Sequence, residues 1–125
     1  MCVQCGNNEP LPSLKNNEKY RLCETCYLKK MSRQSLGTDR HWATLREKLA
    51  TQQYCCAYTG EALVLGVNDS LDHILPMHHF PDSARTPANV EWVTREINEM
   101  KRNRTPEQFL TLIHRILRYR ESGSD

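Results

Sequence analysis

Two Cys-x-x-Cys pairs near the N-terminus constrain this chain more than any other feature. Cys2 and Cys5 form the first pair, and seventeen residues separate it from the second pair, Cys23 and Cys26. Each pair can direct two thiolates at one ion from a tight turn, and two pairs complete the tetrahedral shell of a structural zinc site. Because four protein ligands fill that shell, we expect a structural zinc and not a catalytic one. Free cysteines in a flexible tail are the alternative.

The composition explains why the chain would need a stabilising metal site. Of its 125 residues, 38% are hydrophobic and only 7% are aromatic, which is little for a domain of this size. Zinc binding would contribute folding energy and order the Asn- and Pro-rich segment 7–17 between the two pairs. No apolar run approaches the length of a membrane span, and no basic-then-apolar leader is present. We therefore expect an intracellular chain with reduced thiols and no membrane partner.

Patterning divides the chain into four segments and predicts an α+β fold. We expect a small zinc ribbon over residues 1–36, a linking helix over 37–53, an α+β core with a C-terminal helix over 54–121, and a disordered tail over 122–125. The linking helix is indicated by Thr38 as its N-cap and by an apolar stripe. The stripe consists of Trp42, Leu45 and Leu49.

Within the core segment, the sequence predicts two short strands followed by two helices. The strands are expected at residues 62–64 and 71–75, joined by turn chemistry, and an irregular loop follows over residues 76–87. One helix is predicted to begin at Thr94. The second is marked by Thr105, Pro106 and Gln108, which match a capping box with proline at the first helical position. Its expected buried face consists of Phe109, Leu112, Ile113, Ile116 and Leu117.

Charge is distributed unevenly along the chain. Residues 27–46 carry five basic side chains against one acidic one, and residues 95–120 carry seven against three. Residues 55–91, between these two segments, carry five acidic side chains against one basic. Two basic flanks around an acidic centre suit an enzyme that grips phosphates at its sides and holds a cation in the middle. Ordinary solvated helix faces are the alternative.

Three residues have the chemistry that phosphodiester hydrolysis requires. His73 is suited to take a proton from water near neutral pH. Asp72 and the side-chain oxygen of Asn98 are hard donors of the kind that magnesium prefers. A divalent cation would act as a Lewis acid on the phosphate and the leaving oxygen. The alternative is a surface turn pair and a solvent-facing asparagine.

These residues lie in a pattern that resembles the HNH endonucleases of the ββα-metal class. The matching pieces are Cys-Ala-Tyr-Thr-Gly at 56–60, Asp-His-Ile-Leu-Pro at 72–76, Asn89, and Asn98-x-x-Lys101. Asn98 follows Asn89 by nine residues, the interval usual in that family. The resemblance covers about residues 54–117 and implies a ββα-metal core flanked by helices. Asn98 replaces a frequent histidine, and the internal zinc clamp of many members is absent, since Thr94 and Ile97 occupy its positions.

The resemblance also implies roles for individual residues. His73 would be the general base, Asp72 and Asn98 would ligate Mg²⁺ or Mn²⁺, and Asn89 would brace the loop that orients His73. Lys101 would contact phosphate or steady the helix. The substrate would be DNA, most simply double-stranded, and the products would carry 5′-phosphates. Further contacts to the DNA backbone are expected from two basic residues, Arg102 and Arg104.

Two other functions are compatible with the same residues. One is a zinc-containing module that binds nucleic acid without cutting it, and the other is an interaction protein that dimerises through its C-terminal helix. A homing or phage enzyme is a family-level expectation only. The oligomeric state and the roles of four further residues stay open: Cys55, Cys56, His78 and His79.

Overall fold

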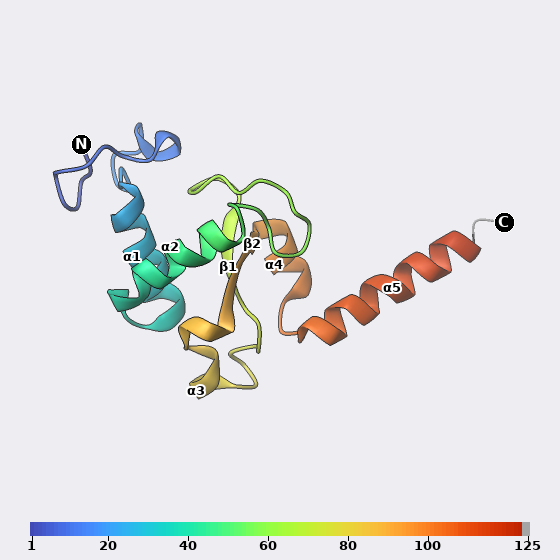
Figure 1. Ribbon diagram of the computed structural model, residues 1–125. Helices are drawn as coiled ribbons and strands as arrows, with labels where there is room; N and C mark the ends of the chain where they lie inside the picture. The colour runs from blue at the N-terminus through green and yellow to red at the C-terminus, as the bar shows by residue number, and fades with distance from the viewer. Residues whose placement is uncertain (124–125) are drawn as a thin grey trace.

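A two-stranded antiparallel sheet occupies the centre of the computed structural model, which describes residues 1–123 (Figure 1). β1 (Asp69–His73) pairs with β2 (Val90–Thr94), and Leu71 lies opposite Trp92. Val90, Trp92 and Val93 are fully buried, so burial of apolar side chains fixes β2 in place. With helices on either side of this sheet, the fold is α+β, as the sequence predicts.

Helices from both ends of the chain pack around β1. α1 (Glu24–Leu36) lies on one side and α4 (Arg95–Lys101) on the other. Successive strand residues face opposite sides, and the contacts follow that alternation. Asp69 and His73 are hydrogen-bonded to α1, whereas Ser70 and Asp72 contact side chains of α4.

α2 (Trp42–Thr51) packs against α1 and β2. It lies within the range predicted for the linking helix, residues 37–53. A 3-10 turn, Asp39–His41, precedes it, and the Thr38 side chain caps that turn. The indole nitrogen of Trp92 donates to the Leu45 carbonyl at 3.0 Å, and the Gln52 side chain bonds both backbone groups of Trp92. The second helix is thereby tied directly to the central strand.

Three segments have local structure that the sequence analysis did not predict. The small zinc ribbon expected over residues 1–36 contains a 3-10 turn, Pro12–Leu14, and ends in the 13-residue helix α1, for which Cys23 is the N-cap. The strand expected at 62–64 is reduced to one bridge between Cys55 and Ala62, and the second strand is β2 instead. The loop expected over 76–87 contains the short helix α3 (Pro81–Ala84), and a 3-10 turn over Pro87–Asn89 follows.

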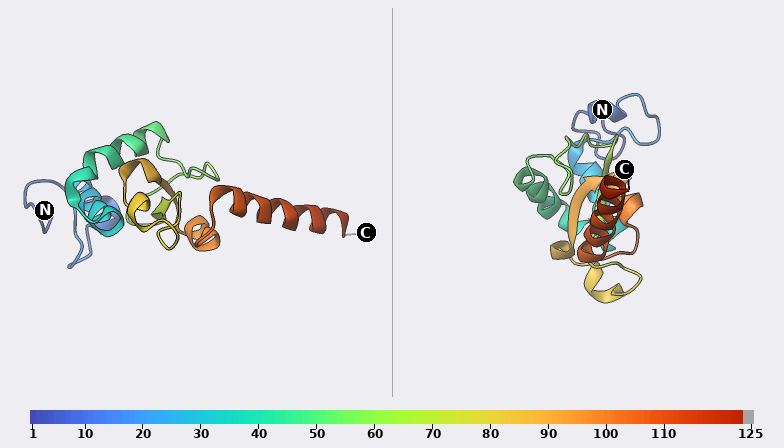
Figure 2. Two further views of the ribbon diagram at one scale, coloured as in Figure 1. Left: turned by 90° about the horizontal axis from the view of Figure 1, so that it is seen from below. Right: turned by 90° about the vertical axis from the view of Figure 1, so that its right-hand side faces the viewer.

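α5 (Pro106–Ser122) begins at the predicted capping box, with both reciprocal hydrogen bonds present. The predicted buried face is wrong for most of its length. Only Phe109 is buried, by an edge-to-face contact with Tyr58, and Ile116 and Leu117 are 48% and 50% exposed. The helix extends away from the rest of the protein (Figure 2). Ser122 is helical, which contradicts a tail beginning there, and residues 124–125 lie outside the described part of the chain.

Within residues 1–123, no helix combines the length and the apolar character needed to cross a membrane.

Candidate functional site

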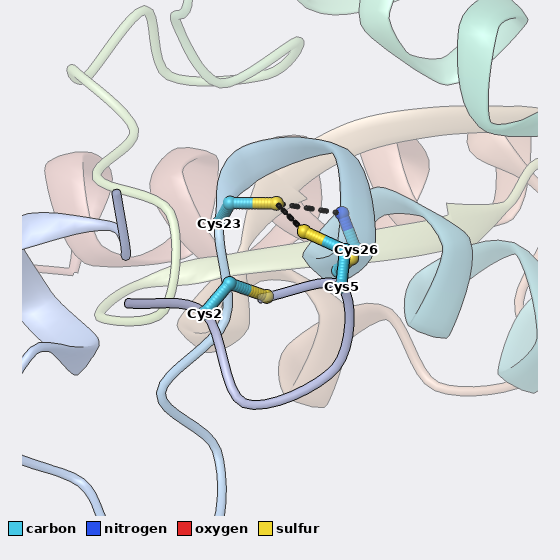
Figure 3. A group of neighbouring side chains, drawn as sticks. All are labelled: Cys2, Cys5, Cys23 and Cys26. Carbon is cyan, nitrogen blue, oxygen red and sulfur yellow. Dashed lines mark hydrogen bonds between the residues drawn. The ribbon is translucent and has the colours of Figure 1, made fainter. Parts of the chain in front are cut away.

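The four N-terminal cysteines converge on one point (Figure 3). Their sulfur atoms all lie within 4.8 Å of one another, and the Sγ atoms of Cys5 and Cys23 are 3.9 Å apart. Two ligands at tetrahedral positions around zinc are separated by about 3.8 Å, as Zn–S bonds of about 2.3 Å require. The donor set and its spacing therefore fit one zinc ion, and the prediction of a four-cysteine cluster that can hold a metal is confirmed.

Two pieces of chain build this cluster. Cys2 and Cys5 lie on a tight turn closed by the Gly6 amide on the Cys2 carbonyl, and Gly6 has a φ of 72°, which a side chain would oppose. Cys23 is the N-cap of α1, and its sulfur accepts from the Cys26 amide at 3.5 Å. The cluster thus joins the N-terminal turn to the start of a helix.

The cysteine thiols in the cluster differ in pKa. For Cys26, burial and the neighbouring thiols raise the pKa to about 12. For Cys2, burial opposes ionisation, but hydrogen bonds from the backbone of Cys5, Cys23 and Gln4 bring the pKa down to about 6. Four thiolates this close repel one another, so a divalent cation is what allows all four to ionise together.

Cys55 and Cys56 lie outside the cluster. The sulfur of Cys56 is buried and accepts from the Thr94 amide at 3.3 Å, whereas Cys55 is half-buried and donates to the Gln53 carbonyl. Among the described residues, neither joins a metal-binding group with His78 and His79, whose rings stack edge to face on an exposed loop. Cys56 is therefore a buried free thiol that packs in the core.

A second candidate site lies at the end of β1. Asp72, His73 and Asn98 line one cavity of about 390 Å³, at the junction of β1 and α4. The remaining lining residues come from the loop after β1 and the turn after α4. They are Pro76, Met77, Arg102 and Asn103. The structure therefore brings together the three residues to which the sequence analysis assigns phosphodiester chemistry, and adds a guanidinium at the same cavity.

The His73 ring is oriented by the backbone of α1. Its Nε2 lies 2.8 Å from the Ser35 carbonyl oxygen, which can only accept a hydrogen bond. In the neutral ring, the proton therefore resides on Nε2, and Nδ1 keeps an unshared electron pair. This tautomer leaves one nitrogen of the imidazole able to accept a proton.

Asp72 and Lys101 form a buried ion pair. The Lys101 ammonium is fully buried and lies 3.2 Å from both Asp72 carboxylate oxygens. It also donates to the carbonyls of His73 and Ile74, at 3.2 and 3.4 Å. Burial raises the pKa of Asp72, and the Lys101 charge opposes that rise. The buried ammonium has no surface to offer a phosphate, and its partners are Asp72 and two backbone carbonyls at the end of β1.

Asn98 and Asn89 differ in how many of their side-chain hydrogen-bonding atoms have partners. Asn98 donates from Nδ2 to the Ser70 hydroxyl at 2.7 Å, and its Oδ1 has no donor among residues 1–123. Asn89 uses its whole side chain, since Oδ1 accepts from the Leu75 amide and Nδ2 donates to the carbonyls of Leu75 and Ala84. Asn89 is therefore a positioning residue that braces the loop after β1.

The two arginines expected at the DNA backbone are placed differently. Arg102 is exposed and lines the cavity of the candidate site. Arg104 lies outside that lining and donates to the Met100 carbonyl at 3.3 Å. Only Arg102 is therefore placed to contact a group bound between β1 and α4.

Sequence reasoning missed two residues at this site. Ser35 acts through its backbone carbonyl, which leaves no signature in the side-chain sequence. Ser70 lies two residues before Asp72, on the same face of β1, so strand periodicity could have indicated it once the strand was correctly placed.

Replacing Lys101 with methionine is expected to lower the free energy of unfolding by about 3–5 kcal/mol, because it leaves a buried carboxylate without its partner. Urea denaturation of the zinc-loaded protein measures the loss. A second replacement, Asp72→Asn in the Lys101→Met background, should restore much of it. If Lys101→Met costs less than about 1 kcal/mol, the pair contributes little to the fold.

A comparison of the chain with models of known protein families finds no match, and a comparison with curated proteins finds no relative. The function therefore has to be argued from the geometry of the two sites.

Proposed function

We propose that this chain is a metal-dependent endonuclease of the HNH type that hydrolyses phosphodiester bonds in DNA, with a separate structural zinc. The observation that carries the proposal is the shared cavity at the end of β1, whose lining residues include Asp72, His73 and Asn98. The order β1, β2, α4 along the chain also agrees with a ββα core. Double-stranded DNA is the proposed substrate.

The donors at the cavity fit a hard divalent cation. Asp72 Oδ2 is buried and accepts no hydrogen bond, although the Lys101 ammonium lies near it. Asn98 adds an amide oxygen from across the strand–helix junction. Magnesium and manganese take oxygen ligands of this kind and retain several waters. When bound, such an ion would polarise the phosphate and stabilise the leaving oxygen.

The protein's own contribution to the reaction begins with His73. Its Nε2–H bond to Ser35 holds the ring in place, and Nδ1 takes a proton from the attacking water. Lys101 holds Asp72 and the end of β1 in register through three acceptors. Asn89 fixes the loop that closes one wall of the cavity. Arg102 contacts the phosphate at the mouth of the cavity.

One observation favours the non-catalytic binding module instead. The Lys101 ammonium already balances the Asp72 charge, so a cation would have to share that carboxylate. The two functions are separated by incubating zinc-loaded protein with supercoiled plasmid and Mg²⁺ or Mn²⁺. The nuclease produces nicked or linear DNA with 5′-phosphate ends, whereas a binding module retards the plasmid and leaves it intact.

The backbone conformation of Arg102 supports a functional role for its side chain. Arg102 has φ 52° and ψ −125°, the first central position of a type II′ turn that the Arg104 amide closes on the Lys101 carbonyl at 3.1 Å. Glycine is favoured there because any side chain strains the turn. An arginine in this strained position is consistent with a functional role for its guanidinium.

Replacing Arg102 with glycine is therefore expected to stabilise the fold by about 1 kcal/mol and to weaken DNA binding. The matched variant Arg102→Ala should weaken binding equally without the gain in stability. Losing one phosphate contact should also reduce the slope of log affinity against log salt by about 1. Thermal denaturation and fluorescence anisotropy measure the two effects. Unchanged affinity in both variants would remove Arg102 from the interface.

A further inference from the structure

A second cavity of about 410 Å³ lies at the opposite end of β1 and has no role in the chemistry described above. It is lined by α1, the start of α4, the segment before α1, Gly66 and the start of β1. The residues that bear on its chemistry are Tyr20, Tyr27, Lys30, Asp69 and Arg95.

Two cations at this cavity have no acidic partner. The Lys30 ammonium lies 4.1 Å from the centre of the Tyr20 ring, which holds it in place without neutralising it. Arg95 donates from Nε to the backbone carbonyl of Asp69 at 3.3 Å. Neither residue forms an ion pair within residues 1–123. Both positive charges are therefore available to a ligand.

The one carboxylate at the cavity is already engaged. Asp69 is 2% exposed, and each of its carboxylate oxygens accepts a hydrogen bond at 2.7 Å, one from the Gly66 amide and one from the Tyr27 hydroxyl. The Asp69 charge raises the pKa of Tyr27 beyond the rise that burial causes, so this hydroxyl stays a donor. Asp69 thus forms part of the cavity wall. The charge that the cavity presents to a ligand comes from the two cations, Lys30 and Arg95.

The two cavities are neighbours along one strand. Ser70 lines the second cavity, Asn98 lines the first, and a 2.7 Å hydrogen bond joins their side chains. Ser70 and Asp72 lie two residues apart on β1, a distance of about 7 Å. Successive charges on a nucleic-acid strand are separated by only a few ångströms along its axis, so one strand can reach both cavities.

We propose that this second cavity binds a backbone phosphate of the strand whose scissile phosphate lies in the first cavity, through Lys30 and Arg95. The inference rests on the proposed nuclease function and extends it, because α1 would then contact the substrate backbone in addition to positioning His73. The cavity would recognise a phosphate anion. A free nucleotide or inorganic phosphate carries the same group as the DNA backbone.

The test compares two charge-matched double variants of the full, zinc-loaded chain. Lys30→Gln with Arg95→Gln removes both cations from the cavity. Lys29→Gln with Arg40→Gln removes two other cations, and Lys29 likewise lies over an aromatic ring, that of Trp42. Binding to a duplex oligonucleotide is measured by anisotropy without added divalent metal, over a range of salt concentrations.

The cavity variant should bind duplex at least about tenfold more weakly, and its salt slope should fall by about 2. The control variant should change affinity less than about twofold. Equal affinities in the two variants would overturn the proposal. Lys30→Arg with Arg95→Lys keeps both charges and should retain affinity, so a loss caused by misfolding is recognised.

A second arm identifies the source of the phosphate. Thermal denaturation with and without inorganic phosphate shows whether the free anion occupies the cavity. If the cavity variant loses stabilisation by phosphate but keeps duplex affinity, the site binds a free anion and the backbone assignment is wrong. If wild type fails to cut plasmid while duplex affinity still depends on Lys30 and Arg95, the nuclease proposal fails and the phosphate cavity stands.

Discussion

Replacing His73 with alanine is expected to slow DNA cleavage by about 10²–10⁴-fold, the usual contribution of a general base. Affinity for duplex DNA should remain within about twofold of wild type, because in the proposed mechanism the imidazole acts on water and not on the DNA backbone. Single-turnover cleavage of a labelled duplex with Mg²⁺ measures the first quantity, and anisotropy without added divalent metal measures the second.

The control for this prediction is His41→Ala, which removes another half-buried imidazole from a site away from the cavity. His73→Ala also loses the hydrogen bond to Ser35, at a cost of about 1 kcal/mol, so both variants are compared well below their unfolding temperatures. Cleavage by His73→Ala at the wild-type rate would show that another group activates the water.

Replacing Cys26 with serine is expected to abolish stoichiometric zinc binding and to lower the free energy of unfolding by several kcal/mol. Apparent zinc-binding free energies of small four-ligand sites are about 10–16 kcal/mol, and this energy is coupled to folding. Cys2, Cys23 and Cys26 are also part of the buried core, at 3%, 3% and 4% exposure. Metal analysis and urea denaturation measure the two losses, and limited proteolysis should cut residues 1–22 first.

Cys55→Ser is the matched control, because Cys55 is a free thiol outside the cluster. It should keep one zinc per chain and wild-type stability within about 0.5 kcal/mol. If Cys26→Ser and Cys55→Ser retain equal zinc and unfold at equal urea concentrations, the cluster is not a structural metal site.

Helix α1 links the two sites. It begins at the four-cysteine cluster with Cys23, and near its other end the Ser35 carbonyl holds His73. Along its length, Tyr27 bonds Asp69 of β1. A loosened N-terminal end of α1 should therefore also disturb the position of the imidazole, so we expect loss of a metal from the cluster to slow the proposed cleavage indirectly.

Local signals in the sequence predicted the features that depend on neighbouring residues. The Thr94 cap, the Thr105 capping box and each of the two Cys-x-x-Cys pairs depend on residues within a few positions of one another. α1 was missed because its N-cap is a cysteine, which also serves the cluster. β2 was missed because Val90, Trp92 and Val93 are buried on both faces, so the strand shows no alternation.

Features that depend on distant contacts could not be predicted from the sequence. The apolar positions of α5 predicted a buried face, but within residues 1–123 only Phe109 is buried and Ile113 packs against the core in part, while the later turns extend away from the protein. The roles of Lys101 and Ser35 depend on residues 29 and 38 positions away in the chain. Only the fold places an ammonium against Asp72 and a carbonyl against His73.

Diffraction from crystals soaked in Mn²⁺, recorded at the manganese absorption edge, tests most directly whether Asp72 and Asn98 hold a cation beside His73. We expect one manganese ion at about 2.2 Å from an Asp72 carboxylate oxygen and from Asn98 Oδ1, with His73 Nδ1 facing its water shell. An empty position at saturating manganese, with Lys101 as the sole cation on Asp72, would contradict the account.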